Sequence, residues 1–192
     1  GKGTVMKALL NKYDNYALSV SATTRNPRPG EENGREYFFL TESQFEDMIK
    51  NDELIEHARY VDHYYGTPKK YVEEKMAAGK DVILEIEIQG ALNIKKKFPD
   101  ALLVFIVPPT AEDLKKRLTG RGTESAEVIE KRLRRAAEES DGMDSYDYIV
   151  VNDDIDTCVE DLHSLIRSSH FKESANTDLV ARMKQELHDM TK

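Results

Sequence analysis

Short apolar runs and longer stretches with helical spacing alternate along the chain. The apolar runs predict buried strands at residues 16–20, 82–88, 101–107 and 148–151. Stretches with helical spacing lie between these runs, and strands separated by helices favour a parallel sheet. The pattern therefore predicts an α/β fold.

Several helix starts are marked by capping residues. Thr41 and Gln44 have the spacing of a capping box, and Thr110 follows two prolines as a cap for the next helix. Thr67 followed by Pro68 predicts a cap with proline at the first helical position.

A helix is also predicted after residue 168. Its apolar positions fall on one face and are Leu179, Val180, Met183, Leu187 and Met190. We expect this face to pack on the body of the protein. Pairing with a second copy of the chain is the alternative, so a homodimer is left open.

Residues 23–37 interrupt the regular pattern. This stretch contains Pro27, Pro29, Gly30 and Gly34, and residues 37–39 then have the composition of a strand. We expect a small β-rich unit inserted into the α/β core.

Composition narrows the classes of function. The chain has 192 residues, a net charge of −8 and one cysteine. The negative charge argues against nucleic acid or an anionic membrane as the main partner. A single cysteine fits a reducing, cytoplasmic setting. The longest purely apolar run, 101–107, is far shorter than the roughly 20 residues that cross a bilayer.

The charge is unevenly spread. Residues 114–136 carry eight Lys or Arg and three Glu, so this segment has a net charge of +5 and the rest of the chain has −13. A basic segment in an acidic protein is typical either of a site for a compact anion, such as a phosphate chain, or of a solvated helix face.

The first residues match the end of a phosphate-binding loop. Gly1 and Lys2 correspond to the final Gly-Lys of G-x-x-x-x-G-K-[ST], with Gly3 in the usual hydroxyl position and Thr4 next. In such loops backbone N–H groups and the lysine bind phosphate. The preceding strand and glycines are not in this sequence, and we expect roughly a dozen or more further N-terminal residues in the native protein.

A more specific series of motifs follows in order. It comprises 19–31 (SVSATTRNPRPGE), Gly34, 37–39, Ile55-Glu56, 64–67 (YYGT), 83–90 (ILEIEIQG), Pro108-Pro109, 117–123 (RLTGRGT) and 151–154 (VNDD). This series resembles the guanylate kinase family, in its bacterial type, from residue 1 to about residue 167.

The resemblance implies a P-loop nucleoside-monophosphate kinase fold, in which a parallel-sheet core carries a GMP-binding insertion and a helical lid. The core would comprise 1–18, 72–112 and 146–192, the insertion 19–71 and the lid 113–145. It also implies transfer of the γ-phosphoryl group of ATP to GMP, with Mg²⁺ as cofactor, in guanine nucleotide metabolism.

The resemblance assigns recognition of the base to Glu56 and Thr67. A carboxylate accepts both N1–H and N2–H₂ of guanine, a pair of donors that adenine lacks, and the threonine hydroxyl would reach O6. Without the resemblance, Glu56 is better interpreted as a surface carboxylate.

The GMP phosphate would be bound by Arg25, Arg28, Tyr37 and Tyr65, with Ser21 and Glu31 as further contacts. Arginine suits phosphate because its planar fork binds two oxygens together. The alternatives are a solubilising role for Arg28 and a core role for the two tyrosines.

Strand periodicity at 82–88 places Ile83, Glu85 and Glu87 on one face. The resemblance assigns Glu85 to the acceptor nucleotide and Glu87 to hydrated Mg²⁺ or an arginine. The family often has Asp at these two positions, and the glutamates of this chain reach one methylene further.

The basic segment gains an interpretation from the resemblance. Arg117, Arg121 and Arg132 match lid arginines that act in catalysis with Lys2, because positioned cations stabilise the charge on a transferring phosphoryl group. ATP would be bound by Gly1, Lys2, Gly3 and Thr4, and on the adenine side by Asn152.

Two other functions remain as alternatives. Guanylate-kinase-like domains also occur as non-catalytic peptide-binding modules, which tend to lose the loop lysine and the lid arginines. A P-loop kinase for another phosphorylated acceptor is the second alternative. Lys2, Arg117, Arg121 and Arg132 argue against the first, and the pair Glu56–Thr67 argues against the second.

Overall fold

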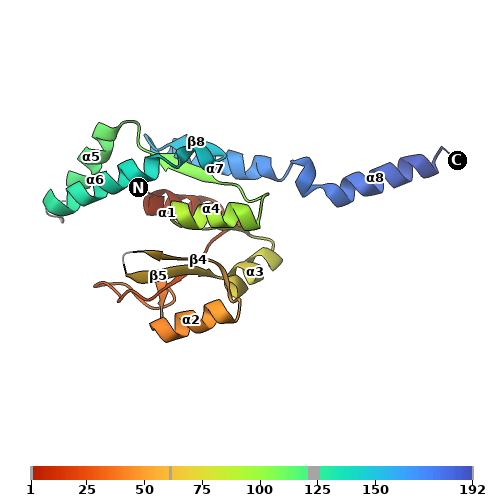
Figure 1. The fold of residues 1–192 in the computed structure, drawn as a ribbon. Coiled ribbons are helices and arrows are strands. Elements are labelled where there is room, and N and C mark those ends of the chain that lie inside the picture. The colour runs from red at the N-terminus through yellow and green to blue at the C-terminus, as the bar shows by residue number, and fades with distance from the viewer. Residues whose placement is uncertain (1, 61, 121–125, 192) are drawn as a thin grey trace. The chain divides into compact units, whose positions relative to one another are not determined.

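The computed structural model describes residues 2–60, 62–120 and 126–191 (Figure 1). Its helices are α1 (Lys2–Lys12), α2 (Glu42–Lys50), α3 (Lys69–Ala77), α4 (Ile88–Lys97), α5 (Ala111–Thr119), α6 (Ala126–Ser140), α7 (Ile155–Ser169) and α8 (Thr177–Asp189), with short 3₁₀ turns η1 (Met143–Ser145) and η2 (Glu173–Ala175). Its strands are β1 (Tyr16–Leu18), β2 (Ser21–Thr23), β3 (Tyr37–Phe39), β4 (Leu54–Tyr60), β5 (His63–Pro68), β6 (Asp81–Ile83), β7 (Val104–Val107) and β8 (Tyr148–Val151).

The chain divides into two compact units. The first contains Gly1–Ala101 and Glu139–Ser145, and the second contains Leu102–Glu138 and Tyr146–Lys192. Each unit is described by itself below.

Parallel strand pairs occur in both units. In the first unit β1 pairs with β6, with Tyr16 opposite Asp81, and in the second β7 pairs with β8, with Val104 opposite Tyr148. Each of these two pairs joins strands that are far apart in sequence and separated by helices, as is usual for parallel pairing, and β2 also pairs in parallel with β3 without a helix between them. The predicted α/β class is confirmed.

The first unit also contains a mixed sheet of order β3-β2-β5-β4. One face of this sheet is covered by α2, where Phe45 is fully buried with Ala22 and Leu54 (Figure 1). The other side meets the rest of the unit through a cluster of Ile55, Val72 and Ile94, which brings β4 against α3 and α4. The β-rich unit expected around residues 23–39 is therefore present.

The capping predictions are confirmed at two helices and wrong at a third. Thr41 and Gln44 form the capping box of α2, and Thr110 accepts from the backbone N–H of Asp113 at 3.0 Å. The helix α3 starts later than predicted, at Lys69, with Pro68 at the N-cap position. Thr67 belongs to β5, and its hydroxyl donates to Glu56 instead of capping a helix.

The strand predicted at residues 82–88 is shorter than expected. β6 ends at Ile83 and α4 begins at Ile88, so Glu85 and Glu87 lie in the connection between them. The inference that Ile83, Glu85 and Glu87 share one strand face is therefore wrong. The predicted strands at 16–20 and 101–107 also shorten, to Tyr16–Leu18 and Val104–Val107.

The second unit has a small core beside its parallel pair. Val150 of β8 and three residues of α7, Cys158, Val159 and Leu162, are buried. The helix α8 forms as predicted, but Leu179, Met183, Leu187 and Met190 are 43–82% exposed, so the expectation that this face packs on the body is wrong. No helix in the described part of the chain is long and apolar enough to cross a membrane.

Candidate functional site

The predicted base-reading pair lies on two neighbouring antiparallel strands. Glu56 of β4 is directly opposite Thr67 of β5, so their side chains share one face of the sheet. The Thr67 hydroxyl donates to Glu56 Oε1 at 2.7 Å, and the two residues are 0% and 7% exposed. Burial raises the pKa of Glu56, and the Thr67 hydroxyl partly offsets this by lowering it.

The second oxygen of this carboxylate, Oε2, faces the first turn of α4 at Gly90. Within the described residues no side chain or backbone group donates a hydrogen bond to it. A buried carboxylate with one anchored oxygen and one available oxygen is able to accept hydrogen bonds from a ligand.

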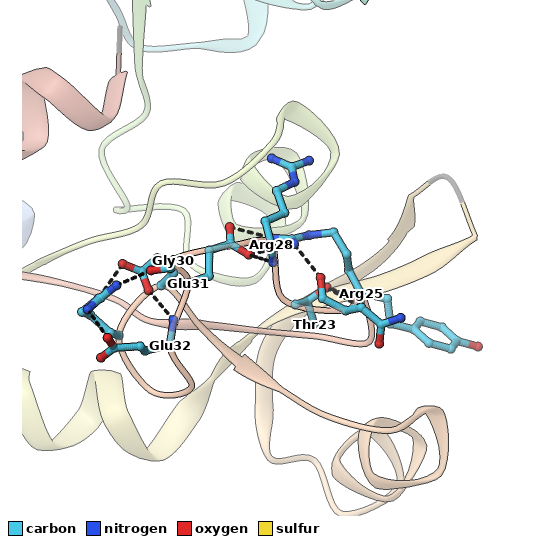
Figure 2. A network of polar contacts seen from close by, with 10 residues as sticks. Thr23, Arg25, Arg28, Gly30, Glu31 and Glu32 are labelled. Carbon is cyan, nitrogen blue, oxygen red and sulfur yellow. Dashed lines mark hydrogen bonds and ion pairs between the residues drawn. The ribbon is translucent and has the colours of Figure 1, made fainter. Parts of the chain in front are cut away.

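The predicted phosphate-binding residues gather at the end of β2. The Arg25 guanidinium forms a two-pronged ion pair with Glu31, at 2.9 Å and 3.0 Å, and Glu31 also accepts the backbone N–H of Arg28 at 2.7 Å (Figure 2). The ion pair raises the pKa of Arg25 and lowers that of Glu31. The Arg28 side chain is exposed, and its guanidinium extends away from the ion pair (Figure 2).

Two tyrosines surround the same arginine. The guanidinium carbon of Arg25 lies 5.2 Å from the ring centre of Tyr37, and the rings of Tyr37 and Tyr65 meet edge to face at 6.2 Å. Burial raises the pKa of Tyr37, and the negative charges of Glu85 and Glu31 add to this. Arg25, Glu31, Tyr37 and Tyr65 therefore form one cluster, with Ser21 opposite Tyr37 in the strand pairing.

Two threonines that the sequence analysis did not select hold this cluster in place. The Thr23 hydroxyl donates to the Tyr64 carbonyl at 2.9 Å and accepts the Arg25 N–H at 3.2 Å. Thr24 accepts the Tyr64 N–H at 3.0 Å. These bonds hold the backbone of Arg25 and of Tyr64, the residue before Tyr65. The only signal in the sequence is a Thr-Thr pair immediately before an arginine.

The start of α1 lies near the acidic connection between β6 and α4. Both carboxylate oxygens of Glu85 lie 3.9 Å from the position that a Cβ on Gly3 would occupy. Glu87 keeps solvent contact, but desolvation and then the charge of Glu139 raise the pKa of its carboxyl, whereas Lys2 lowers it. Lys2, Gly3 and Thr4 are exposed.

In the second unit, Arg117 is joined to the loop after β8. Its guanidinium donates to the Asn152 carbonyl at 2.7 Å, and Asn152 is 6% exposed. Arg132 is exposed on α6. The predicted residues Gly1 and Arg121 lie outside the described residues.

Comparison with known proteins supplies the family. A family model described as guanylate kinase matches residues 1–169. The chain is 47% identical to the guanylate kinase of Caldanaerobacter subterraneus, over 97% of this chain and 90% of that protein. It is 49% identical to the guanylate kinase of Lactococcus lactis, over 90% of this chain and 84% of that protein.

The chain belongs to the guanylate kinase family.

A solved guanylate kinase also resembles the structure. The crystal structure of guanylate kinase from Anaplasma phagocytophilum matches with a TM-score of 0.73 at 33% identity, over 88% of this chain and 82% of that one. The nucleoside-monophosphate kinase fold predicted from the sequence is therefore confirmed for this guanylate kinase family member.

Members of the guanylate kinase family are nucleotide phosphotransferases that typically use a divalent metal. The described residues contain no group of three or more His, Cys, Asp or Glu side chains close enough to hold an ion. A metal that arrives with a nucleotide fits this arrangement, because Mg²⁺ keeps several waters and takes few protein carboxylates. Glu85 lies near the start of α1, and Glu87 is exposed in the same connection between β6 and α4.

Proposed function

We propose that this chain transfers the γ-phosphoryl group of ATP to GMP and releases ADP and GDP. The observation that carries the proposal is the buried pair Glu56–Thr67, which offers an available carboxylate oxygen beside a hydroxyl on one sheet face. Family membership supports the reaction class, and this pair supports the choice of acceptor.

Guanine fits the pair by hydrogen-bond chemistry. Its N1–H and N2–H₂ are two adjacent donors whose hydrogen bonds an ionised Glu56 accepts. The Thr67 hydroxyl donates its one proton to Glu56 in this structure, and would turn to donate it to O6 when guanine binds. Adenine presents an acceptor where guanine has N1–H, so adenine would leave the buried carboxylate unpaired. An unpaired buried polar group costs about 1–3 kcal/mol, and more if it is charged. The pair thus disfavours AMP.

The cluster around Arg25 fits the monophosphate. The Arg25 fork already holds the two oxygens of Glu31, a geometry that also suits two phosphate oxygens. The tyrosine hydroxyls of Tyr37 and Tyr65 and the exposed guanidinium of Arg28 supply further donors. Ser21, Glu31 and Glu85 complete the proposed acceptor site.

On the donor side, Lys2 and the exposed start of α1, with Gly1, Gly3 and Thr4, would bind the ATP phosphates. Asn152 would contact adenine, and Arg117 would position its loop through the carbonyl hydrogen bond. In the reaction an oxygen of the GMP phosphate bonds to the γ-phosphorus, and the bond from that phosphorus to the β–γ bridging oxygen breaks. The negative charge on the transferring phosphoryl group would be offset by four cationic side chains, Lys2, Arg117, Arg121 and Arg132.

We propose Mg²⁺ as the divalent metal and Glu87 as the residue that contacts its hydration shell. When bound, Mg²⁺ would offset the negative charge of the phosphate chain. The chain's own contribution is to orient this assembly at the start of α1.

The proposal is tested by ADP formation from ATP in the presence of GMP, AMP, CMP or UMP. Turnover with GMP and little turnover with the other three is the expected result. A folded protein that is inactive with every acceptor would contradict the proposal and favour the non-catalytic peptide-binding module. Turnover with AMP, CMP or UMP in preference to GMP would contradict the role of Glu56 and Thr67.

Replacing Thr23 tests whether the backbone clamp at the end of β2 serves phosphate binding. In Thr23→Val the hydroxyl that accepts the Arg25 N–H is lost while the side-chain shape is kept. We expect the KM for GMP to rise about threefold to tenfold, as for the loss of one or two hydrogen bonds. Steady-state kinetics measures this change.

Thr23→Ser is the matched control, because it restores the hydroxyl and should restore the KM. Guanosine, which lacks the phosphate, should inhibit the wild-type and Thr23→Val proteins with the same Ki. Equal weakening of guanosine and GMP would contradict a role that acts through the phosphate-binding residues.

A further inference from the structure

The first turn of α4 lies unusually close to the base-reading carboxylate. A Cβ placed on Gly90, the third residue of α4, would lie 2.8 Å from Glu56 Oε2 and 3.3 Å from Glu56 Cδ. Side-chain carbon atoms do not approach an oxygen to 2.8 Å without displacement of one of the two. Any side chain at position 90 would therefore move the Glu56 carboxylate.

Space, and not backbone conformation, requires glycine at this position. Gly90 lies inside a regular helix, and the glycines with positive φ in the described residues are Gly30, Gly34 and Gly79. An alanine is compatible with helical φ and ψ, and it is a better helix former than glycine. The steric restriction at position 90 thus comes from Glu56. The next nearest atom, Ile86 Cδ1, would lie 3.4 Å from the added Cβ, which is an ordinary van der Waals distance.

Glu56 has little freedom to accommodate a neighbour. Its Oε1 accepts the Thr67 hydroxyl at 2.7 Å, and the residue is 7% exposed. A methyl group at position 90 would push Oε2 away from α4 and rotate the carboxylate about the oxygen that Thr67 holds. The displaced oxygen is the one that has no donor among the described residues, and hence the one available to a ligand.

We propose that Gly90 is a specificity-determining residue for the nucleotide acceptor: the absence of a side chain at this point of α4 allows Glu56 to hold its carboxylate where it accepts both N–H donors of a 2-aminopurine base. This inference rests on the proposed function. It adds the first turn of α4, a helix of the core, to the base-recognition site formed by β4 and β5.

The test is the variant Gly90→Ala. We expect the KM for GMP to rise about tenfold or more, because small displacements of a positioned group have large effects. The Ki of guanosine should rise with it, while the KM for ATP stays unchanged. The preference for GMP over IMP, which lacks the 2-amino group, should shrink. The melting temperature should show that the variant is folded, since the helix preference of alanine offsets part of the cost of moving Glu56.

A second variant separates displacement of the carboxylate from other effects. Aspartate is shorter by one methylene, so Glu56→Asp withdraws the carboxylate from α4. Adding Gly90→Ala to Glu56→Asp should therefore raise the KM for GMP much less than Gly90→Ala does in the wild-type background. Gln89→Ala, an exposed change in the same helical turn, is the matched control and should leave the KM unchanged.

The possible results distinguish failure of the inference about Gly90 from failure of the proposed function. An unchanged KM for GMP in a folded Gly90→Ala protein would overturn the inference and leave the proposed function intact, and so would equal effects of Gly90→Ala in both backgrounds. If the wild-type protein itself did not use GMP, the proposed function would fail and the inference would fail with it.

Discussion

Glu56→Gln should lower kcat/KM for GMP by about 100-fold or more and leave the KM for ATP unchanged. Glutamine keeps the shape of the side chain and the acceptor for the Thr67 hydroxyl, but it replaces one carboxylate oxygen by an N–H₂ group that faces the guanine donors. The glutamine N–H₂ would then face a guanine N–H donor in a buried site, with no acceptor between them. A site that recognises its substrate by buried hydrogen bonds loses much of its affinity when those bonds cannot form. Steady-state kinetics with each substrate varied in turn measures the effect.

The same residue predicts a pH dependence. Burial raises the pKa of Glu56, so the ionised form that accepts guanine is lost earlier on acidification than for an exposed glutamate. The KM for GMP should rise as pH falls through this raised pKa, and the rise should be absent in Glu56→Gln. Because the folded-state pKa lies above the unfolded one, ionised Glu56 costs stability above that pKa, and the cost disappears as pH falls through it. Because Glu56→Gln has no buried charge at this position, its free energy of unfolding at neutral pH should not be lower than that of the wild type.

Glu53→Gln is the matched control, since it is the same chemical change at an exposed position just before β4. It should leave GMP kinetics unchanged. A similar loss in both variants, or a rise in the KM for ATP equal to that for GMP, would refute the assignment of Glu56 to the base.

The second large effect is expected at Arg25. Arg25→Lys keeps the charge but loses both the fork that holds two oxygens and the planar contact with Tyr37. We expect the KM for GMP to rise about 100-fold, because charge-assisted paired hydrogen bonds are worth about 1.5–3 kcal/mol. The Ki of guanosine should change little, because guanosine has no phosphate for this arginine.

Arg35→Lys provides the control for this experiment. Arg35 lies in the same loop and pairs with Glu32 and Glu36, but its side chain is 53% exposed and outside the cluster. The variant should behave as wild type. If Arg25→Lys weakened guanosine as much as GMP, Arg25 would be supporting the fold of the loop and not the binding of phosphate.

Apolar spacing in the sequence predicted the element types better than their ends. Residues 84–88 alternate apolar and acidic side chains, which is typical of a strand, yet β6 ends at Ile83 and α4 begins at Ile88. Leu84 and Ile86 still pack on the cluster of Ile55, Val72 and Ile94. The alternation therefore indicated which side chains pack inward, although it did not show where the strand ends.

The helix α8 also shows what apolar spacing does not predict. Its apolar face was predicted from spacing and forms a helix, but spacing carries no information about what covers that face. Local capping, by contrast, was predictable, because Thr41 and Thr110 act on residues three positions away.

Some residues of the candidate site could be predicted from the sequence, and others could not. Glu56 and Thr67 meet through strand register, which spacing alone does not give, and the family motifs supplied the pairing in advance. Thr23 and Gly90 carry no chemical signal of their own, because their roles depend on neighbours distant in sequence, Tyr64 and Glu56.

The most direct test of base recognition is equilibrium binding of GMP, IMP and AMP, measured by calorimetric titration without ATP. The experiment isolates the proposed acceptor site, because the residues proposed to bind the base and the phosphate all lie in the unit Gly1–Ala101 with Glu139–Ser145. GMP should bind most tightly, IMP more weakly because it lacks one donor, and AMP most weakly, with the advantage of GMP over IMP lost in Glu56→Gln. Equal binding of the three nucleotides to the wild-type protein would contradict the assignment of Glu56 and Thr67 as the residues that select guanine.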